Sequence, residues 1–230
     1  MIDFHSHILP GIDDGSESVE ETRKMLSMLV EQNIKTIIAT PHYYAEQESV
    51  EEFLVRRKEA YDKIKDLNEN INILLGAEVY YYEGIKRLNN LKDLCLENTK
   101  VILIEMPFEK WNEYIVNELI ELSHRYMLQI VLAHIERYLS YGNLIYIERL
   151  IENGVLIQIN ASFINERKTQ RKALKMLKKG YVHFIGSDCH NTHSRPPRIG
   201  EAYQTINKKF GNHFLNEMNA FEKNIIFKRK

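Results

Sequence analysis

The 230-residue chain has the composition of a globular protein, and its balanced charge excludes some classes of partner. Hydrophobic residues make up 44% and charged residues 27%, and the formal net charge is −1. This balance gives no electrostatic reason to expect nucleic acid or an acidic membrane surface as a partner. Two cysteines, Cys95 and Cys189, are too few for a disulfide framework and indicate a reducing compartment. With no predicted signal peptide and no apolar stretch of roughly 20 residues, we expect a cytoplasmic protein that does not insert into membranes.

Apolar runs of strand length alternate with segments of helical periodicity along the chain. The expected strands are Ile2–His7, Lys35–Thr40, Asn72–Val79, Val101–Glu105, Gln129–Ala133, Val155–Asn160 and Val182–Gly186. The expected helices are Ser18–Gln32, Glu48–Asn68, Glu113–Tyr126, Asn143–Asn153 and Lys168–Lys179, with a short helix after Val79 and one or two more at the end of the chain.

This alternation predicts one α/β domain spanning residues 1–230. Strands that are joined through helices by short connections run parallel and are covered by those helices. About seven β–α units, with no linker or repeat between them, favour a closed, TIM-like (β/α)7 barrel, with an open sheet as the alternative. In such barrels the chemistry lies at the C-terminal ends of the strands, so a functional site is expected there.

Histidines and carboxylates end nearly all of the expected strands. Residues chosen only to make turns would favour Gly, Asn, Ser and Pro, and only the sixth strand ends in such a residue, Asn160. Because alternate residues of a strand share a face, His5 and His7 point the same way and can grip one metal ion. The candidates at the strand ends are His5, His7, His42, Glu78, Glu105, His134, Asp188 and His190.

Metal ions explain why so many ionisable groups would meet at one rim. Crowded carboxylates and imidazoles would repel one another or lie desolvated unless cations neutralised them. Mixed nitrogen and oxygen ligands favour Mn, Fe or Zn over Ca or Mg, and eight or nine ligands are too many for one ion, so we expect two or three. Asp14 is expected to reach a neighbouring ion, and Asp13 is the second choice, better suited to a turn. The histidines left unassigned are His124, His183, His193 and His213.

Two arginines, Arg137 and Arg195, each follow candidate ligands by a few residues. Guanidinium groups bind phosphate oxygens through paired hydrogen bonds. Beside a metal cluster, the two arginines favour a phosphate ester as the substrate.

A competing motif is the C-x5-R spacing of Cys189 and Arg195, which cysteine-dependent phosphatases share. The intervening HNTHS has no glycine that would let the backbone wrap around a phosphate. We therefore expect Cys189→Ser to leave most activity intact, and loss of all turnover with normal metal content would favour the thiolate mechanism instead.

The segments MIDFHSHILPGIDDG, ATPHY, GAEVYY, AHIERY and GSDCHN together resemble the polymerase-and-histidinol-phosphatase (PHP) superfamily. They are most similar to the manganese-dependent tyrosine phosphatases of bacterial capsule and exopolysaccharide operons, and the similarity runs from Met1 to about Phe210. The resemblance implies a distorted barrel, the PHP fold, with three metal ions. By the family pattern, the ions are held by His5, His7, Glu78 and Asp188, by Glu78, Glu105 and His134, and by Asp14, His42 and His190. Arg137 and Arg195 fall where the family places phosphate-binding arginines, although Ile135 stands where the family commonly has proline.

The resemblance also implies a reaction and a partner. A metal-activated hydroxide would attack the phosphorus of phosphotyrosine, while the ions and the arginines stabilise the growing charge. Asp188 or His190 is the candidate proton donor for the leaving phenol. The implied partner is a cognate autophosphorylated tyrosine kinase that controls polysaccharide polymerisation, and the acidic segment Glu46–Glu52 would disfavour some acidic phosphopeptides. An aromatic rim for the phenyl ring has four candidates that can equally pack in the core: Tyr80, Tyr81, Tyr82 and Trp111.

Three other functions stay open. Histidinol phosphatase, or another small-molecule phosphomonoesterase, would use the same metals, and turnover on histidinol phosphate would reveal it. A metal-dependent amidohydrolase fits the barrel but has no need of two arginines. A non-catalytic metal-binding scaffold is disfavoured because the ligand pattern is complete, and an assay with p-nitrophenyl phosphate and manganese tests the last two.

Overall fold

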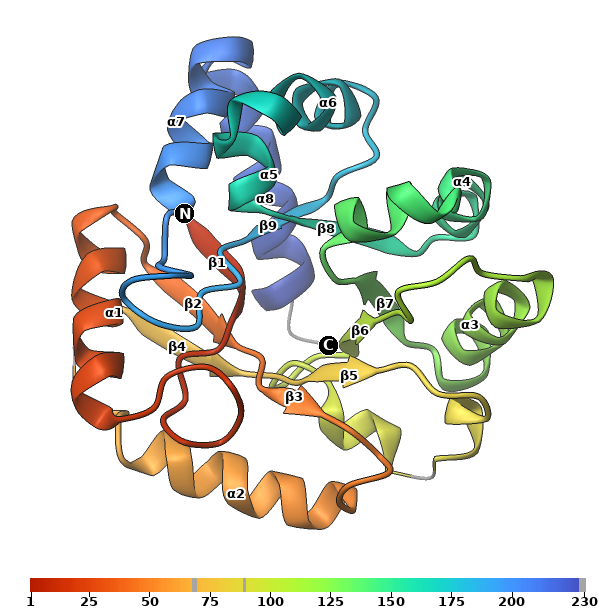
Figure 1. Ribbon diagram of the computed structural model, residues 1–230, viewed down its shortest axis with the longest axis horizontal. Coiled ribbons are helices and arrows are strands. Elements are labelled where there is room, and N and C mark those ends of the chain that lie inside the picture. The colour runs from red at the N-terminus through yellow and green to blue at the C-terminus, as the bar shows by residue number, and fades with distance from the viewer. Residues whose placement is uncertain (68–69, 89, 228–230) are drawn as a thin grey trace.

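Parallel strands curl around a central axis in the computed structural model, which describes residues 1–67, 70–88 and 90–227 (Figure 1). All of the expected strands are present, and every paired strand is parallel to its neighbours. In chain order they are β1 Ile2–Ser6, β2 Thr36–Ala39, β3 His42–Tyr43, β4 Asn72–Leu75, β5 Glu78–Tyr80, β6 Val101–Glu105, β7 Gln129–Leu132, β8 Leu156–Asn160 and β9 Phe184–Gly186.

Two strands of the sheet are each divided into two parts. The second expected strand is found as β2 and continues beyond its expected end as β3, after Pro41, which has no N–H for the ladder, and the third is broken at Gly76 into β4 and β5. The ladder continues across both breaks, because the Gly76 amide donates to the carbonyl of Ala39 at 2.8 Å and the Glu78 amide donates to that of Pro41 at 3.0 Å. Each divided strand therefore fills one position in the sheet.

The sheet closes where β1 meets the end of β9. The His7 amide donates to the carbonyl of Cys189 at 2.9 Å, and the Asp188 amide donates to that of His5 at 2.8 Å. Ser6 and Cys189 also form a parallel bridge. The strand positions thus complete a ring, which confirms a distorted TIM-like (β/α)7 barrel over the open sheet.

A bulge in β1 decides which side chains reach the inside of the barrel. Asp3 and Ser6 are three residues apart, but their partners in β2 are only two apart, so β1 carries one extra residue. Such a bulge shifts the alternation of side chains by one position. Phe4 packs inside the barrel below the bulge, and His5 and His7 face inward above it. Both histidines therefore point toward the site and away from the covering helices.

The interior below the site is filled by apolar side chains. The rings of Phe4 and Phe184 stack with centroids 3.9 Å apart. Ile226, from the last helix, belongs to the same cluster and closes the N-terminal end of the barrel. This apolar layer excludes water from the N-terminal side of the polar residues above it. Its members are Ile2, Phe4, Ile38, Leu96, Val101, Leu103, Val131, Ala133, Leu156, Phe184 and Ile226.

Helices surround the barrel (Figure 1). The long ones are α1 Val19–Glu31, α2 Val50–Asp62, α3 Glu113–Tyr126, α4 Leu144–Glu152, α6 Arg167–Lys178, α7 Ile199–Phe210 and α8 Asn212–Phe227. The short ones are η1 Ile85–Arg87, η2 Leu91–Leu94, η3 Ile135–Tyr141 and α5 Ala161–Asn165. η3 and α5 were not expected, because segments this short show little periodicity. The helix expected to reach Asn68 ends at Asp62, and Asn68 itself lies outside the described residues. None of the described helices combines the length and the apolar character that a membrane crossing requires.

Side-chain caps explain where two of these helices begin. The Ser18 hydroxyl accepts a hydrogen bond from the Glu21 amide at 3.2 Å at the start of α1. At α2, Ser49 and Glu52 form a capping box, in which each side chain bonds to the other residue's backbone amide. Both devices satisfy amides that have no partner within the helix.

Glu222 of α8 is buried and gives stability a testable dependence on pH. Burial raises the pKa of its carboxyl from 4.5 to about 8. Between these values the folded protein keeps a proton that the unfolded chain releases, so this carboxyl favours unfolding more strongly as the pH rises. We expect Glu222→Gln to raise the melting temperature near pH 8 and to change it little near pH 5. Melting curves followed by circular dichroism measure this, and the same shift at both pH values would contradict it.

Candidate metal centre

All nine candidate ligands gather at the C-terminal end of the barrel. They lie at or just after the ends of strands, apart from one in the loop after β1 and two at the first residues of β3 and β5. Most are buried, but the side chain of Asp14 is 66% exposed and that of His42 is 15% exposed. The nine are His5, His7, Asp14, His42, Glu78, Glu105, His134, Asp188 and His190.

The first group of ligand atoms is formed by His5, His7 and Asp188, with Glu78 beside it. The Nε2 atoms of His5 and His7 lie 3.1 Å apart. Oδ1 of Asp188 lies 3.7 Å from the first and 3.5 Å from the second. Oε2 of Glu78 lies 3.2 Å and 3.3 Å from the same two nitrogens. This arrangement brings together the ligands expected for the first ion.

Glu78 stands between this group and the second one. Its Oε1 lies 2.8 Å from Nε2 of His134, which also lies 3.3 Å from Oε1 of Glu105. Because one carboxylate oxygen faces the first group and the other faces His134, Glu78 has the position of a bridging ligand. His42 joins the second group as well, since its Nδ1 lies 3.1 Å from Glu78 Oε2 and 3.9 Å from Glu105 Oε2.

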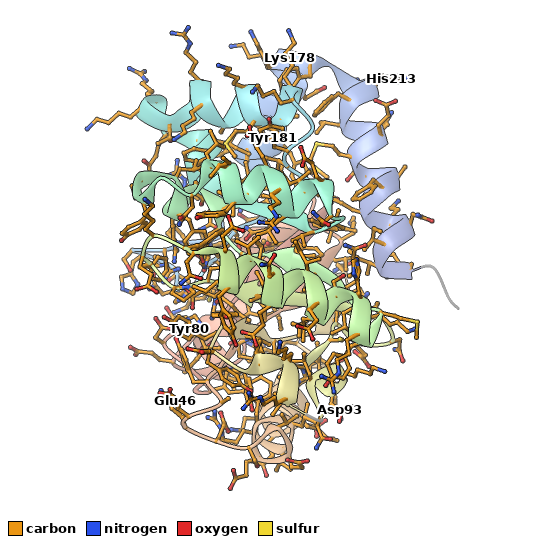
Figure 2. All side chains as sticks on the ribbon, turned by 90° about the vertical axis from the view of Figure 1, so that its right-hand side faces the viewer. Glu46, Tyr80, Asp93, Lys178, Tyr181 and His213 are labelled. Atoms are coloured by element: carbon orange, nitrogen blue, oxygen red, sulfur yellow. The ribbon has the colours of Figure 1, made fainter. Side chains whose placement is uncertain are left out.

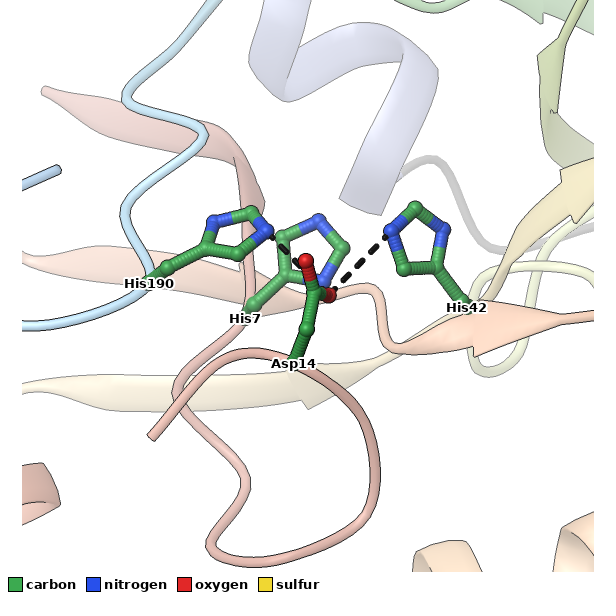
Figure 3. A group of neighbouring side chains, drawn as sticks. All are labelled: His7, Asp14, His42 and His190. Carbon is green, nitrogen blue, oxygen red and sulfur yellow. Dashed lines mark ion pairs between the residues drawn. The ribbon is translucent and has the colours of Figure 1, made fainter. Parts of the chain in front are cut away.

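The third group surrounds Asp14, as Figure 3 shows. Oδ1 of Asp14 lies 3.5 Å from Nε2 of His42 and 3.4 Å from Nε2 of His190, and His7 completes the group. His42 therefore presents one ring nitrogen to the third group and the other to the second. The family pattern assigns His42 to the third ion alone, so the structure offers a second arrangement for this ring.

The residues present fit divalent cations. Among the described residues, Nδ1 of His42 and Nε2 of His190 are buried and have no hydrogen-bond partner. A buried ring nitrogen without a partner is costly, and a metal ion would satisfy it. The donors are imidazole nitrogens and carboxylate oxygens, which are ligands that Mn, Fe and Zn accept.

Carboxylates in the cluster favour a proton on His134, one of its histidines. Although burial opposes ionisation, the charge on His5 and hydrogen bonds from other histidines hold the pKa of Glu78 well below 4.5. Burial also opposes a proton on His134, but Glu105 and Glu78 raise its pKa to about 9. Metal ions would take the place of such a proton, because metal ligands bind in their deprotonated forms.

Polar side chains behind the ligands fix the orientation of their rings. Nδ1 of His7 donates to Asp13 Oδ2 at 2.7 Å, and Nδ1 of His5 donates to Gln158 Oε1 at 3.3 Å. Each ring then offers its Nε2 to an ion. Burial opposes ionisation of Asp13, but His7 lowers the pKa of its carboxyl to about 2. Asp13 also accepts the Gly15 amide at 3.0 Å, so it has the turn role expected of it and orients His7 as well.

The role of Asp13 leads to a prediction about metal affinity. Residues that orient metal-binding histidines typically contribute a factor of about 10 to 100 in affinity. We expect Asp13→Asn to bind manganese about tenfold or more weakly while still reaching near-normal turnover at saturating manganese. Titration of activity with manganese measures this, and an unchanged midpoint would show that Asp13 does not support His7.

Arg137 and Arg195 converge on Asp188. A terminal nitrogen of each lies near Asp188 Oδ2, at 2.5 Å for Arg137 and 2.7 Å for Arg195. Nδ2 of Asn160 donates to the same oxygen at 2.7 Å. The two arginine side chains are 36% and 38% exposed and line a cavity of about 320 Å³ beside the cluster. Asn160, which seemed to be the exception among the strand ends, thus helps to hold Asp188.

Cys189 is not placed to act as a nucleophile. Its side chain is fully buried, and burial raises the pKa of the thiol well above 9. A nucleophilic cysteine needs an accessible thiolate, so the C-x5-R motif has no catalytic geometry here.

Of the four aromatic residues considered for the rim, three pack in or against the hydrophobic core: Tyr81, Tyr82 and Trp111. Tyr81 is buried and donates to Glu118 at 2.6 Å, and Trp111 is buried as well. Tyr80 contacts Tyr44, with ring centroids 5.6 Å apart, and the ring of Tyr44 lies 5.4 Å from that of His42. Figure 2 shows Tyr80 at the edge of the molecule. An aromatic residue that the sequence did not suggest, Phe108, is 42% exposed and lies 6.1 Å from the ring of His134.

The histidines that were left unassigned lie outside the ligand groups. His183 Nδ1 accepts the Ile157 amide at 3.0 Å, and burial lowers the pKa of its ring to about 4. His213 is exposed and lies 3.3 Å from Glu217. Neither His124 nor His193 belongs to a ligand group of the described residues.

A closed parallel barrel with nitrogen and oxygen ligands gathered at its strand ends is the arrangement of metal-dependent barrel enzymes. The model of the family described as "Capsular polysaccharide synthesis, CpsB/CapC" matches residues 1–227, and the chain belongs to this family.

The names of similar proteins agree with this assignment. Tyrosine-protein phosphatase CpsB of Streptococcus pneumoniae is 33% identical over 229 residues, which are 92% of this chain and 91% of the relative. Tyrosine-protein phosphatase YwqE of Bacillus subtilis is 32% identical over 219 residues, 92% of this chain and 85% of the relative. A solved structure from work on these two proteins, called unique metal-dependent tyrosine phosphatases, superposes with a TM-score of 0.86 at 26% identity, covering 100% of this chain and 96% of the other. The resemblance seen in the sequence motifs is thus confirmed.

Proposed function

We propose that the protein is a metal-dependent protein-tyrosine phosphatase, which hydrolyses phosphotyrosine on a partner protein. The observation that carries this proposal is the meeting of Arg137 and Arg195 at Asp188, beside a cluster of metal ligands and at the wall of a cavity. Cations and guanidinium groups in one place suit a phosphoryl group better than any neutral substrate. The relatives named tyrosine-protein phosphatases support the phosphotyrosine specificity.

The chain's own residues would bind and orient the phosphoryl group. Bound divalent ions supply an activated water and neutralise phosphoryl charge. Arg137 and Arg195 would move from Asp188 to the phosphoryl oxygens, where two paired hydrogen bonds fix the group in place. Asn160 would keep its hydrogen bond to Asp188 and hold that carboxylate in position while the arginines bind the substrate.

The leaving group needs little help from an acid. Burial opposes ionisation of Asp188, but the charge on His5 and contacts with His7 keep its pKa well below 3.8. Burial and the charge on His7 lower the pKa of His190 to about 4. Neither group holds a proton readily near pH 7, which disfavours both as proton donors. A phenol with a pKa of about 10 leaves without full protonation, which suits phosphotyrosine better than aliphatic phosphates.

We propose three ions, most suitably manganese, bound by the nine ligands. Support comes from the three groups into which the ligand atoms fall and from the nitrogen and oxygen donors. Glu78 would bridge the first two ions, and His42 would take part in the second or the third.

The proposal extends to the setting of the enzyme. We infer that residues 1–230 form one PHP-type phosphohydrolase domain, that it works in the cytoplasm, and that its partner is an autophosphorylated tyrosine kinase of capsule synthesis. The family's description supports the link to capsule, and the two free, buried cysteines are compatible with a reducing compartment.

An assay of the purified protein with and without metal tests the proposal. We expect turnover of p-nitrophenyl phosphate and of a phosphotyrosine peptide with added manganese, and none after chelation. Histidinol phosphate and phosphoserine peptide serve as control substrates and should turn over far more slowly. Faster turnover of histidinol phosphate would replace the proposal with a small-molecule phosphatase, and no turnover with any divalent metal would exclude a phosphatase.

A further inference from the structure

Helix α6 carries an unusual concentration of positive charge. Seven basic residues lie within Arg167–Lys179, and this segment contains no acidic residue. All seven side chains are exposed, and no ion pair is recorded for any of them in the described part of the chain. Without these seven positive charges, the rest of the chain has a formal net charge of −8, compared with −1 for the whole chain. The seven are Arg167, Lys168, Arg171, Lys172, Lys175, Lys178 and Lys179.

These side chains form a single face of the helix. With 3.6 residues per turn, all seven fall within about 140° of the helix circumference. Ala173, Met176 and Leu177 lie on the other side and are buried against the protein. Because the apolar side is already covered, this face can attract a partner only through charge.

The basic face, as we call these seven residues, begins at the cavity beside the metal centre. Asn165 and Glu166, which immediately precede α6, line this cavity together with Arg137 and Arg195. The Asn165 amide donates to the carbonyl of Arg198, another residue of the cavity wall, at 2.8 Å. A substrate peptide that extends out of the cavity on this side therefore reaches α6 first.

The opposite side of the molecule carries negative charge. The start of α2 and the loop before it form a hollow lined by Glu48, Glu51 and Glu52, of which Glu48 is paired with Arg56 in the same lining. Figure 2 shows Glu46, from the same loop, and Lys178, from α6, toward opposite ends of the molecule. A substrate chain with uneven charge would therefore be favoured in only one orientation.

We propose that the basic face of α6 binds an acidic segment of the phosphoprotein substrate. The inference rests on the proposed function, because it takes the substrate to be a protein chain bound at the cavity. The position of the face favours this partner over an anionic membrane, since α6 begins beside the cavity that Arg137, Arg195 and Arg198 line, with a single acidic residue, Glu166, between them. The helix is about 18 Å long, which an extended chain spans with about six residues. The acidic segment should therefore lie within roughly ten residues of the phosphotyrosine.

Two variants with equal loss of charge test the proposal. Lys168→Gln, Lys172→Gln and Lys175→Gln, made together, neutralise part of the basic face and keep good helix formers. The matched control makes the same change at three exposed lysines on other helices, Lys24, Lys208 and Lys223. Each protein is assayed on four substrates: p-nitrophenyl phosphate, a neutral phosphotyrosine peptide, and two versions of that peptide with about six glutamates on the N-terminal or on the C-terminal side.

We expect the wild-type protein to prefer one acidic peptide over the neutral one by about tenfold in kcat/KM at low salt, through KM. The α6 variant should lose this preference, the control should keep it, and all three proteins should hydrolyse p-nitrophenyl phosphate alike. High salt should abolish the preference, because exposed charges are screened. Equal losses in both variants, or no preference in the wild type, would overturn the proposal.

Two further measurements separate this proposal from its rivals. If no phosphotyrosine substrate is hydrolysed, the proposed function fails, and fluorescence anisotropy of an unphosphorylated acidic peptide still tests the basic face by itself. Sedimentation with phosphatidylglycerol vesicles tests the membrane. Binding to vesicles that depends on the α6 lysines, without a preference for acidic peptides, would replace the proposed partner with a lipid surface.

Discussion

Replacing Glu78 with glutamine is expected to lower turnover of p-nitrophenyl phosphate at least about a thousandfold. Oε2 of Glu78 lies 3.1 to 3.3 Å from ring nitrogens of three histidines, and its Oε1 lies 2.8 Å from Nε2 of His134. Glutamine keeps the size of the side chain but offers one oxygen and no charge. Two ions would lose their common ligand, so bound manganese should fall together with turnover.

A matched variant shows whether the position or the charge matters. Glu46→Gln removes the same charge from an exposed residue of the loop before α2 and should keep near-normal turnover. Elemental analysis gives the metal content of each protein, and circular dichroism shows that both fold.

Glu105→Ala tests the same centre and should also lose turnover by orders of magnitude. Near-normal turnover in Glu105→Ala, or undiminished manganese in Glu78→Gln, would reject a multinuclear centre.

Most of the fold was predictable because strand length and β–α alternation are local signals. The expected helix Glu113–Tyr126 has the bounds found in the structure, and a capping asparagine, Asn112, marks its start. The continuation of the second strand as β3 and the break in the third were missed because β2 and β3, like β4 and β5, keep one ladder across the gap. The five-residue helix α5 was missed because one turn has no measurable period.

The metal ligands were predictable because a barrel brings the ends of its strands together. The alternation within β1 showed that His5 and His7 share a face, but only the bulge decides that this face is the inner one. A bulge depends on pairing with β2 and leaves no mark in the sequence of β1 itself. The two-sided position of His42 and the hydrogen bond from Asn160 to Asp188 also arise from tertiary contacts. The nine ligands together remain a prediction until metal is measured.

The net charge of the chain does not describe how charge is distributed over its surface. A value of −1 gave no reason to expect nucleic acid or an acidic membrane surface, and opposite charges are nevertheless segregated onto α6 and onto the start of α2. Net charge is a sum, and it hides a surface on which positive and negative residues are gathered on different helices. For this chain the distribution of charge, and not its total, is what bears on partners.

Removing the two arginines is expected to separate phosphate binding from metal binding. We expect Arg137→Ala and Arg195→Ala each to lower kcat/KM for a phosphotyrosine peptide by about a hundredfold, and the double variant to lose more. Each guanidinium supplies charge and paired hydrogen bonds to a phosphoryl group. Manganese content should stay normal, because Asp188 keeps Asn160 and its neighbouring histidines as partners when the arginines are gone.

A third arginine of the cavity, Arg198, provides the control for this prediction. It lines the same cavity, but its Nε and a terminal nitrogen donate to Glu201 at 2.8 and 2.6 Å. Since this guanidinium is already paired with a carboxylate, Arg198→Ala should change kcat/KM by less than about threefold. Competitive inhibition by inorganic phosphate should weaken in the Arg137 and Arg195 variants and persist in the Arg198 variant. If all three variants lose activity alike, the arginines support the loop after β9 and do not bind the phosphoryl group.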